Sequence, residues 1–103
     1  MAKKTKKLTE TVILISPPEG TWIQSTVGLY WNFHSQAKTY TVQVAFDPSF
    51  TRLFTTQNVS GISTDVSNLN TATKYWWRVQ AVNGSASSEF STPSSFATFG
   101  FTV

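Results

Sequence analysis

Short segments in which hydrophobic and polar residues alternate recur along the chain, and turn-forming residues separate them. In the clearest segment, residues 75–81, the odd-numbered positions are aromatic or aliphatic, whereas Arg78 and Gln80 are polar. An alternation with a period of two is typical of a strand that buries one face. The pattern predicts about seven strands, near residues 12–15, 27–33, 40–46, 50–56, 63–66, 75–81 and 95–101.

No segment carries the 3.6-residue period of an amphipathic helix, and the connections between the expected strands are short. Connections of this length suit antiparallel neighbours, because parallel neighbours need a long crossover. The sequence therefore predicts an all-β, antiparallel β-sandwich of about seven strands.

Several segments resemble fibronectin type III domains, which are immunoglobulin-like sandwiches. Leu69-Asn-Thr-Ala-Thr-Lys-Tyr75, which runs into Trp77-Arg-Val-Gln-Ala-Val-Asn83, is similar to the corner that opens the sixth strand of that family. Thr71 stands where the family has proline. Leu29-Tyr-Trp31, Tyr40-Thr-Val-Gln-Val-Ala45 and the segment 91–98 are similar to further strands of these domains, so the resemblance spans about residues 13–98.

The resemblance implies roles for four core residues. It implies that the Tyr75 ring enters the core while its hydroxyl bonds to upstream backbone, and that Leu69, in the same motif, is a structural residue. Trp31 and Trp77 are expected in the core, from the resemblance and from the alternation respectively. The segments 40–45 and 77–79 look more like bacterial and phage modules than animal ones.

The positive charge is concentrated at the N-terminus. The net charge is +3, yet Lys3, Lys4, Lys6 and Lys7 alone contribute four positive charges. The other four basic residues face five acidic ones, which leaves the rest of the chain at −1. We interpret residues 1–10 as a basic arm that contacts a neighbouring subunit and residues 11–103 as the domain. Lysines without interleaved aromatic residues argue against a nucleic-acid partner.

The composition offers little for catalysis. The chain has no cysteine, which excludes disulfides and thiolate metal sites, and no apolar run long enough to cross a membrane. Its one histidine, His34, is expected at the surface near a strand end, and no motif surrounds it. We therefore expect no enzymatic activity, no metal and no cofactor.

Two sets of residues are candidates for partner binding. Alternation places Trp76 and Arg78 on the outer face of one strand with Gln43 beside them. Trp76 either forms a cation–π contact with Arg78 or meets a partner, and a planar tryptophan also suits a sugar. Near the C-terminus, Phe99 and Phe101 share a face that either covers the chain's own core or joins a partner's sheet.

Trp22, in the first loop, is expected to cover one end of the core.

These observations favour a structural or interaction module. The first hypothesis is an accessory (decoration) protein of a phage capsid or tail, located in the virion and bound to other subunits. It follows from the short chain that starts with methionine, the absence of a signal peptide and the module type. The alternative is a spacer, adhesion or carbohydrate-contacting module of a secreted bacterial enzyme or adhesin, which would be extracellular.

Overall fold

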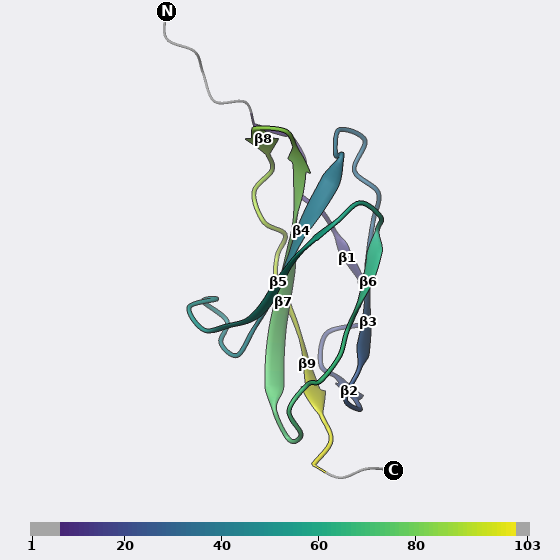
Figure 1. The fold of residues 1–103 in the computed structure, drawn as a ribbon, viewed down its shortest axis with the longest axis vertical. Helices are drawn as coiled ribbons and strands as arrows, with labels where there is room; N and C mark the ends of the chain where they lie inside the picture. The colour runs from purple at the N-terminus through teal and green to yellow at the C-terminus, as the bar shows by residue number, and fades with distance from the viewer. Residues whose placement is uncertain (1–6, 101–103) are drawn as a thin grey trace, which may run out of the picture.

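The computed structural model describes residues 7–100 and shows two β-sheets packed face to face, with no helix in this range (Figure 1). The smaller sheet has the strand order β1-β3-β6, and the larger has the order β2-β9-β7-β4-β5, with β8 paired to β7. The strands are β1 (Leu14–Ser16), β2 (Thr21–Ile23), β3 (Val27–Trp31), β4 (Thr39–Ala45), β5 (Leu53–Val59), β6 (Ser63–Val66), β7 (Lys74–Asn83), β8 (Ala86–Ser87) and β9 (Ser94–Thr98).

The predicted all-β sandwich is confirmed, and β2 and β8 are short additions to the expected strands. The prediction of antiparallel pairing throughout is wrong, because β2 pairs in parallel with β9, with Thr21 opposite Phe96. The turn formed by Pro17, Pro18 and Gly20 carries the chain from β1 in the smaller sheet to β2 in the larger one. The chain from β3 to β8 lies between β2 and β9, so it provides the long connection that a parallel pair needs.

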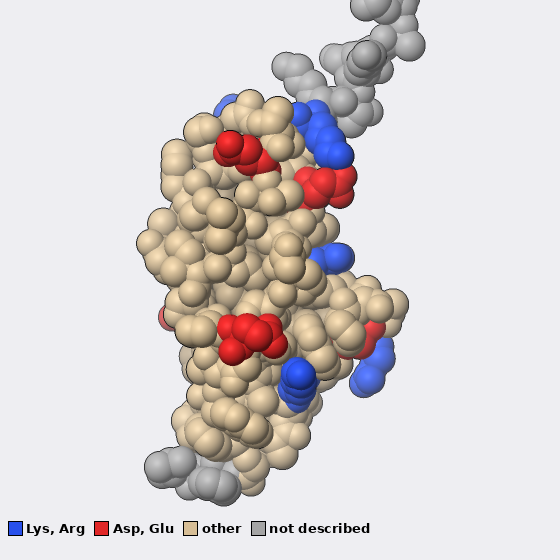
Figure 2. Space-filling model, turned by 180° about the vertical axis from the view of Figure 1, so that it is seen from behind, with Lys and Arg blue, Asp and Glu red and all other residues tan. Residues whose placement is uncertain are grey.

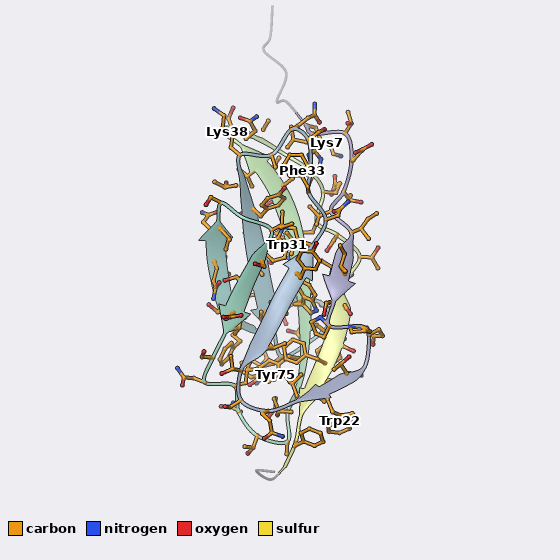
Figure 3. The ribbon with its side chains drawn as sticks, turned by 90° about the vertical axis from the view of Figure 1, so that its right-hand side faces the viewer. Lys7, Trp22, Trp31, Phe33, Lys38 and Tyr75 are labelled. Carbon is orange, nitrogen blue, oxygen red and sulfur yellow. The ribbon has the colours of Figure 1, made fainter. Side chains whose placement is uncertain are left out.

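The core lies between the two sheets, where Figure 3 shows Trp31 and Tyr75 pointing inward. Alternation on β7 buries every second side chain, from Tyr75 to Ala81, against the inner face of β3. The four residues for which the sequence indicates core positions, Leu69, Trp31, Tyr75 and Trp77, are all buried. The other fully buried apolar residues are Leu29, Val42, Val44, Ala45, Val79, Ala81 and Phe96.

Tyr75 is the centre of an aromatic cluster. Its ring centroid lies 5.2 Å from that of Phe46, 5.4 Å from Phe54 and 5.5 Å from Phe96. Its hydroxyl accepts a hydrogen bond of 2.7 Å from the backbone N–H of Asn70. Burial raises the pKa of Tyr75, so the phenol stays protonated near neutral pH. Both ends of the side chain are therefore fixed.

His34 is buried, so the prediction of a surface histidine is wrong. It is 3% exposed, and its Nε2 lies 2.8 Å from the carbonyl oxygen of Glu10. The backbone N–H of Gln36 donates to Nδ1 at 3.1 Å. We infer that Nε2 carries the proton and donates to Glu10, because Nδ1 is already an acceptor. The histidine thus joins the loop after β3 to the N-terminal segment, a long-range contact that the sequence does not signal.

Residues 7–10, which the sequence assigns to the arm, lie against the sandwich. Leu8 is buried, and its N–H donates to the carbonyl of Ser87 at 3.0 Å. Lys7 forms an exposed ion pair with Glu89. The scattered acids of the domain therefore do provide a contact for Lys7. Lys3, Lys4 and Lys6 lie outside the described residues.

Tyr75→Phe should destabilise the protein by about 1–3 kcal/mol, because the part-buried hydrogen bond from the N–H of Asn70 loses its acceptor. Urea denaturation followed by circular dichroism measures the change. Tyr30→Phe, at an exposed tyrosine of β3, is the matched control and should leave the unfolding midpoint unchanged. A Tyr75→Phe midpoint equal to that of the wild type would contradict the role given to this hydroxyl.

Candidate functional site

Arg78, on the outer face of β7, is held by contacts within the chain. Its guanidinium carbon lies 4.2 Å from the ring centroid of Phe50 and 4.0 Å from that of Phe90. Its Nε donates to Oε1 of Gln43 at 2.9 Å. Desolvation lowers the pKa of Arg78, although an arginine stays charged at neutral pH. Of the two alternatives for Trp76, the cation–π contact with Arg78 is not the one formed, because the guanidinium of Arg78 packs against two phenylalanines from loops.

The turn before β5 places Phe50 over this arginine. Asp47 accepts hydrogen bonds from the Thr51 hydroxyl at 2.6 Å and from the Arg52 N–H at 2.9 Å. These bonds lower the pKa of Asp47. Phe50 has a φ of 57°, an uncommon conformation for a bulky residue that the surrounding turn maintains. The contacts of Arg78 and Gln43 therefore stabilise the fold locally.

Trp76 has a different cation from the expected one. The ammonium of Lys74 lies 5.0 Å from the centroid of the Trp76 ring, within cation–π range. Both side chains stand on the outer face of β7, two residues apart. Their neighbours on β9 are small, since Ala97 is opposite Lys74 and Ser95 is opposite Trp76. The outer face of β9 beside Lys74 therefore carries only small side chains.

Trp22 borders these small side chains of β9 from the opposite side, on β2. It is opposite Ala97 in the β2–β9 pair and is 61% exposed. Its ring stacks on Phe99, with centroids 5.6 Å apart and planes inclined by 28°. The prediction that Trp22 covers the core is wrong, because alternation within β2 turns Ile23 toward the core and Trp22 away from it. Figure 3 shows Trp22 at the end of the sandwich, pointing outward.

Between Trp22 and Lys74 lies an open groove of about 500 Å³. We call it the Trp22 groove. The small residue Ala97 lines the groove between Trp22 and Lys74, and Thr73 and Gly100 line it as well. An exposed aromatic ring beside such a hollow is the kind of feature that binds a partner in many proteins.

The end of β9 differs from the prediction. The strand ends at Thr98, whereas alternation suggests continuation to residue 101. Phe99 donates its N–H to the carbonyl of Ile23, and its own carbonyl accepts from the N–H of Ala72, both at 3.0 Å. Phe99 is thus fixed beneath Trp22 rather than placed along the sheet edge. Phe101 lies outside the described residues.

Glu19 fixes the turn that leads into β2. Its carboxylate accepts hydrogen bonds from the hydroxyl and the backbone N–H of Ser95, at 2.5 and 2.8 Å, and from the hydroxyl of Ser94 at 3.3 Å. The Ser95 bonds are the main reason why the pKa of Glu19 is lowered, and the positive charge of Lys74 adds to the effect. The carboxylate therefore ties β2, and with it Trp22, to β9.

The hydroxyl groups that line the Trp22 groove already have partners. Thr73 donates to the carbonyl of Thr71 at 2.8 Å, and Thr98 donates to that of Asn70 at 2.5 Å. Lys74 also lines the groove, and its ammonium lies over the ring of Trp76. The groove thus offers mainly apolar contact, with one positive charge at its side.

The ionisable groups of residues 7–100 form no cluster of metal ligands. In this range no group of three or more histidine, cysteine, aspartate or glutamate side chains is placed to hold a metal ion. On the face shown in Figure 2, charged residues lie singly or in pairs, with broad uncharged surface between them. No helix in the described part of the chain could cross a membrane.

No protein-family model and no curated protein sequence matches the chain. Solved structures match its fold. The crystal structure of FN3tt is 24% identical, with 87% of this chain and 90% of that chain covered and a TM-score of 0.65. A Fn3-like protein from Clostridium thermocellum is 19% identical over 82% and 92% of the two chains, with a TM-score of 0.64. The fn3 domain of human collagen alpha-1(XX) is 19% identical over 87% and 86%, with a TM-score of 0.68. The protein therefore has a fibronectin type III fold.

Truncating the tryptophans should separate core from surface. Trp77→Ala should cost about 3–5 kcal/mol of unfolding free energy, because it leaves a large cavity. Trp22→Ala should cost much less, since most of this side chain is already in water. Urea denaturation of both variants measures the difference. Equal losses would show that Trp22 belongs to the core.

Acid should weaken the link made by Glu19. Because its folded-state pKa is lowered, the carboxylate stabilises the protein above the ordinary glutamate value of 4.5 and loses this effect as the pH falls through the lowered pKa. Glu19→Gln should therefore show a smaller loss of stability between neutral pH and pH values below 4.5. Thermal melting as a function of pH measures this, with Ser95→Ala as a second variant that lacks the main donor. An unchanged acid profile in both variants would contradict the link.

Proposed function

We propose that the protein is a non-enzymatic interaction module that holds another protein subunit through the Trp22 groove. The observation that carries this proposal is the large exposed area of Trp22 beside an apolar hollow. A tryptophan in this setting gains much of its contact energy only when a partner covers it. Its backbone is held by the parallel pairing of β2 with β9 and by the Glu19 hydrogen bonds, so the ring is presented at a fixed place.

A protein side chain suits the groove better than a sugar does. Sugar recognition needs several free hydrogen-bonding groups, and the hydroxyls of Thr73 and Thr98 already donate within the chain. A partner that inserts an apolar or aromatic residue, with a carboxylate close to Lys74, would match both the apolar surface and the charge. A carbohydrate remains the second candidate, favoured by the exposed planar face of Trp22.

The finer proposal is that the assembly is a phage virion and that the chain decorates its capsid or tail. Its support is the sequence resemblance of the segments 40–45 and 77–79 to phage modules, together with the basic N-terminal segment that would add charged contacts to the subunit. The competing proposal is a spacer or adhesion module of a secreted bacterial protein, for which the same fold would serve.

The test is co-expression with the structural proteins encoded beside its gene, followed by sedimentation of the assembled particles. The wild-type chain should sediment with the particles, and Trp22→Ala should weaken its binding by about thirtyfold, the size of a typical hot-spot loss. Phe33→Ala is the matched control. Phe33 is 69% exposed at the opposite end of the sandwich (Figure 3), so this variant should bind like the wild type.

Absence of the wild-type chain from the particles would overturn the virion proposal. Equal binding of the Trp22→Ala and wild-type chains would overturn the role of the groove. Affinity electrophoresis in gels that contain bacterial polysaccharides tests the second candidate. Retardation that Trp22→Ala abolishes would assign the groove to a sugar instead of a protein.

A further inference from the structure

The larger sheet ends in a long and chemically unprotected strand. β5 pairs with β4 on one side, and within the described chain no strand lies along its other edge. Its seven residues, Leu-Phe-Thr-Thr-Gln-Asn-Val, include no charged residue and no proline. Natural edge strands usually carry one of these features, or are very short, because a free edge invites pairing with another chain.

The other edges of this sandwich do carry such protection. β1 and β2 have three residues each, and Pro17 and Pro18 lie between them. β6 has four residues and includes the exposed charge of Asp65. The short strand β8 is covered by a bridge from Lys7 to Ser87. β5 therefore stands apart from every other edge in the described chain.

The geometry of β5 suits strand addition. The register with β4 shifts near Leu53, but the pairs from Thr55 to Val59 are regular. The side chains of Thr56 and Asn58 are exposed on the outer face of the sheet, whereas those of Gln57 and Val59 turn toward the core. Backbone groups directed away from β4 thus form a row that a further strand can meet.

We propose that β5 pairs antiparallel with β5 of a second copy of this chain, which joins the two larger sheets into one. A two-fold axis perpendicular to the sheet requires that facing residues lie on the same side, so the register must be centred on a residue. Centring it on Thr56 sets Thr56 opposite Thr56 and Thr55 opposite Gln57, within the part of β5 whose pairing with β4 is regular.

Charge favours a second copy as the occupant. No charged residue lies within β5, so no like charges face each other along the paired strands. Arg52 lies directly before the strand, so the two arginines would lie at opposite ends of the pair. β2, which carries Trp22, is at the other edge of the same sheet, so the pairing leaves the Trp22 groove open. With few hydrogen bonds and little apolar area, the dimer should be weak and concentration-dependent.

Sedimentation velocity over a concentration series tests the dimer. The wild-type chain should shift from monomer to dimer as its concentration rises. Thr56→Lys places two ammonium groups opposite each other at the axis and should weaken the dimer by roughly fivefold or more. Ser63→Lys, on the exposed edge strand of the smaller sheet, is the matched control and should dimerise like the wild type. Both variants should keep the wild-type melting temperature at low concentration, because both side chains are exposed.

A charge-swap experiment tests the register. Thr56→Asp alone should also dimerise weakly, whereas an equimolar mixture of Thr56→Lys and Thr56→Asp should form a heterodimer. A wild-type chain that stays monomeric up to its solubility limit would overturn the proposal. So would a Thr56→Lys chain that dimerises like the wild type, or a mixture that stays monomeric.

Discussion

The packing of Tyr75 between the two sheets is the interaction on which the rest of the structure depends. Its ring contacts Phe46, Phe54 and Phe96, and its hydroxyl holds the backbone of Asn70. Side chains alternate between the two faces of a strand, so placing one residue in the core determines which face every other residue of that strand occupies. With Tyr75 inside, β7 must direct Lys74, Trp76 and Arg78 outward.

The alternation of side chains along β7 determines which residues form the outer surface of the larger sheet. The centre of the larger sheet is closed, since Arg78 is sandwiched between Phe50 and Phe90 and its Nε donates to Gln43. The open part lies toward the β2 edge, where Ala97 separates Lys74 from Trp22. A closed centre and an open edge explain why the groove, and not the Arg78 cluster, is the better binding surface.

Much of the fold could be predicted from the sequence, because the alternation of hydrophobic and polar residues within each strand indicates which side chains are buried. The sequence predicts which side chains of residues 75–81 face inward, and it predicts the core positions of Trp31 and Trp77. The aromatic partners of Arg78 were not predictable, since Phe50 and Phe90 come from loops whose paths depend on the whole fold. The burial of His34 has the same cause, because its partner Glu10 is 24 residues away.

The candidate site was only partly predictable. Trp76 and Arg78 are on the expected face, but the sequence places Trp22 over one end of the core, because a three-residue strand gives too short an alternation to recognise. Once residues 21–23 are known to form a strand, the apolar Ile23 on the inner face indicates that Trp22 points outward. The parallel pairing with β9, which completes the groove, joins segments at opposite ends of the chain and leaves no local signal.

The central claim is that Trp22 is the solvent-facing indole of a preformed groove while Trp31 and Trp77 belong to the core. Hydrogen–deuterium exchange of the four indole N–H groups, followed by NMR, tests it most directly. The Nε1 atoms of Trp31 and Trp77 are buried and have no hydrogen-bond partner, so exchange there requires opening of the core. The account predicts fast exchange for Trp22 and slow exchange for those two. Protection of Trp22 comparable to that of Trp31 in the isolated protein would contradict it.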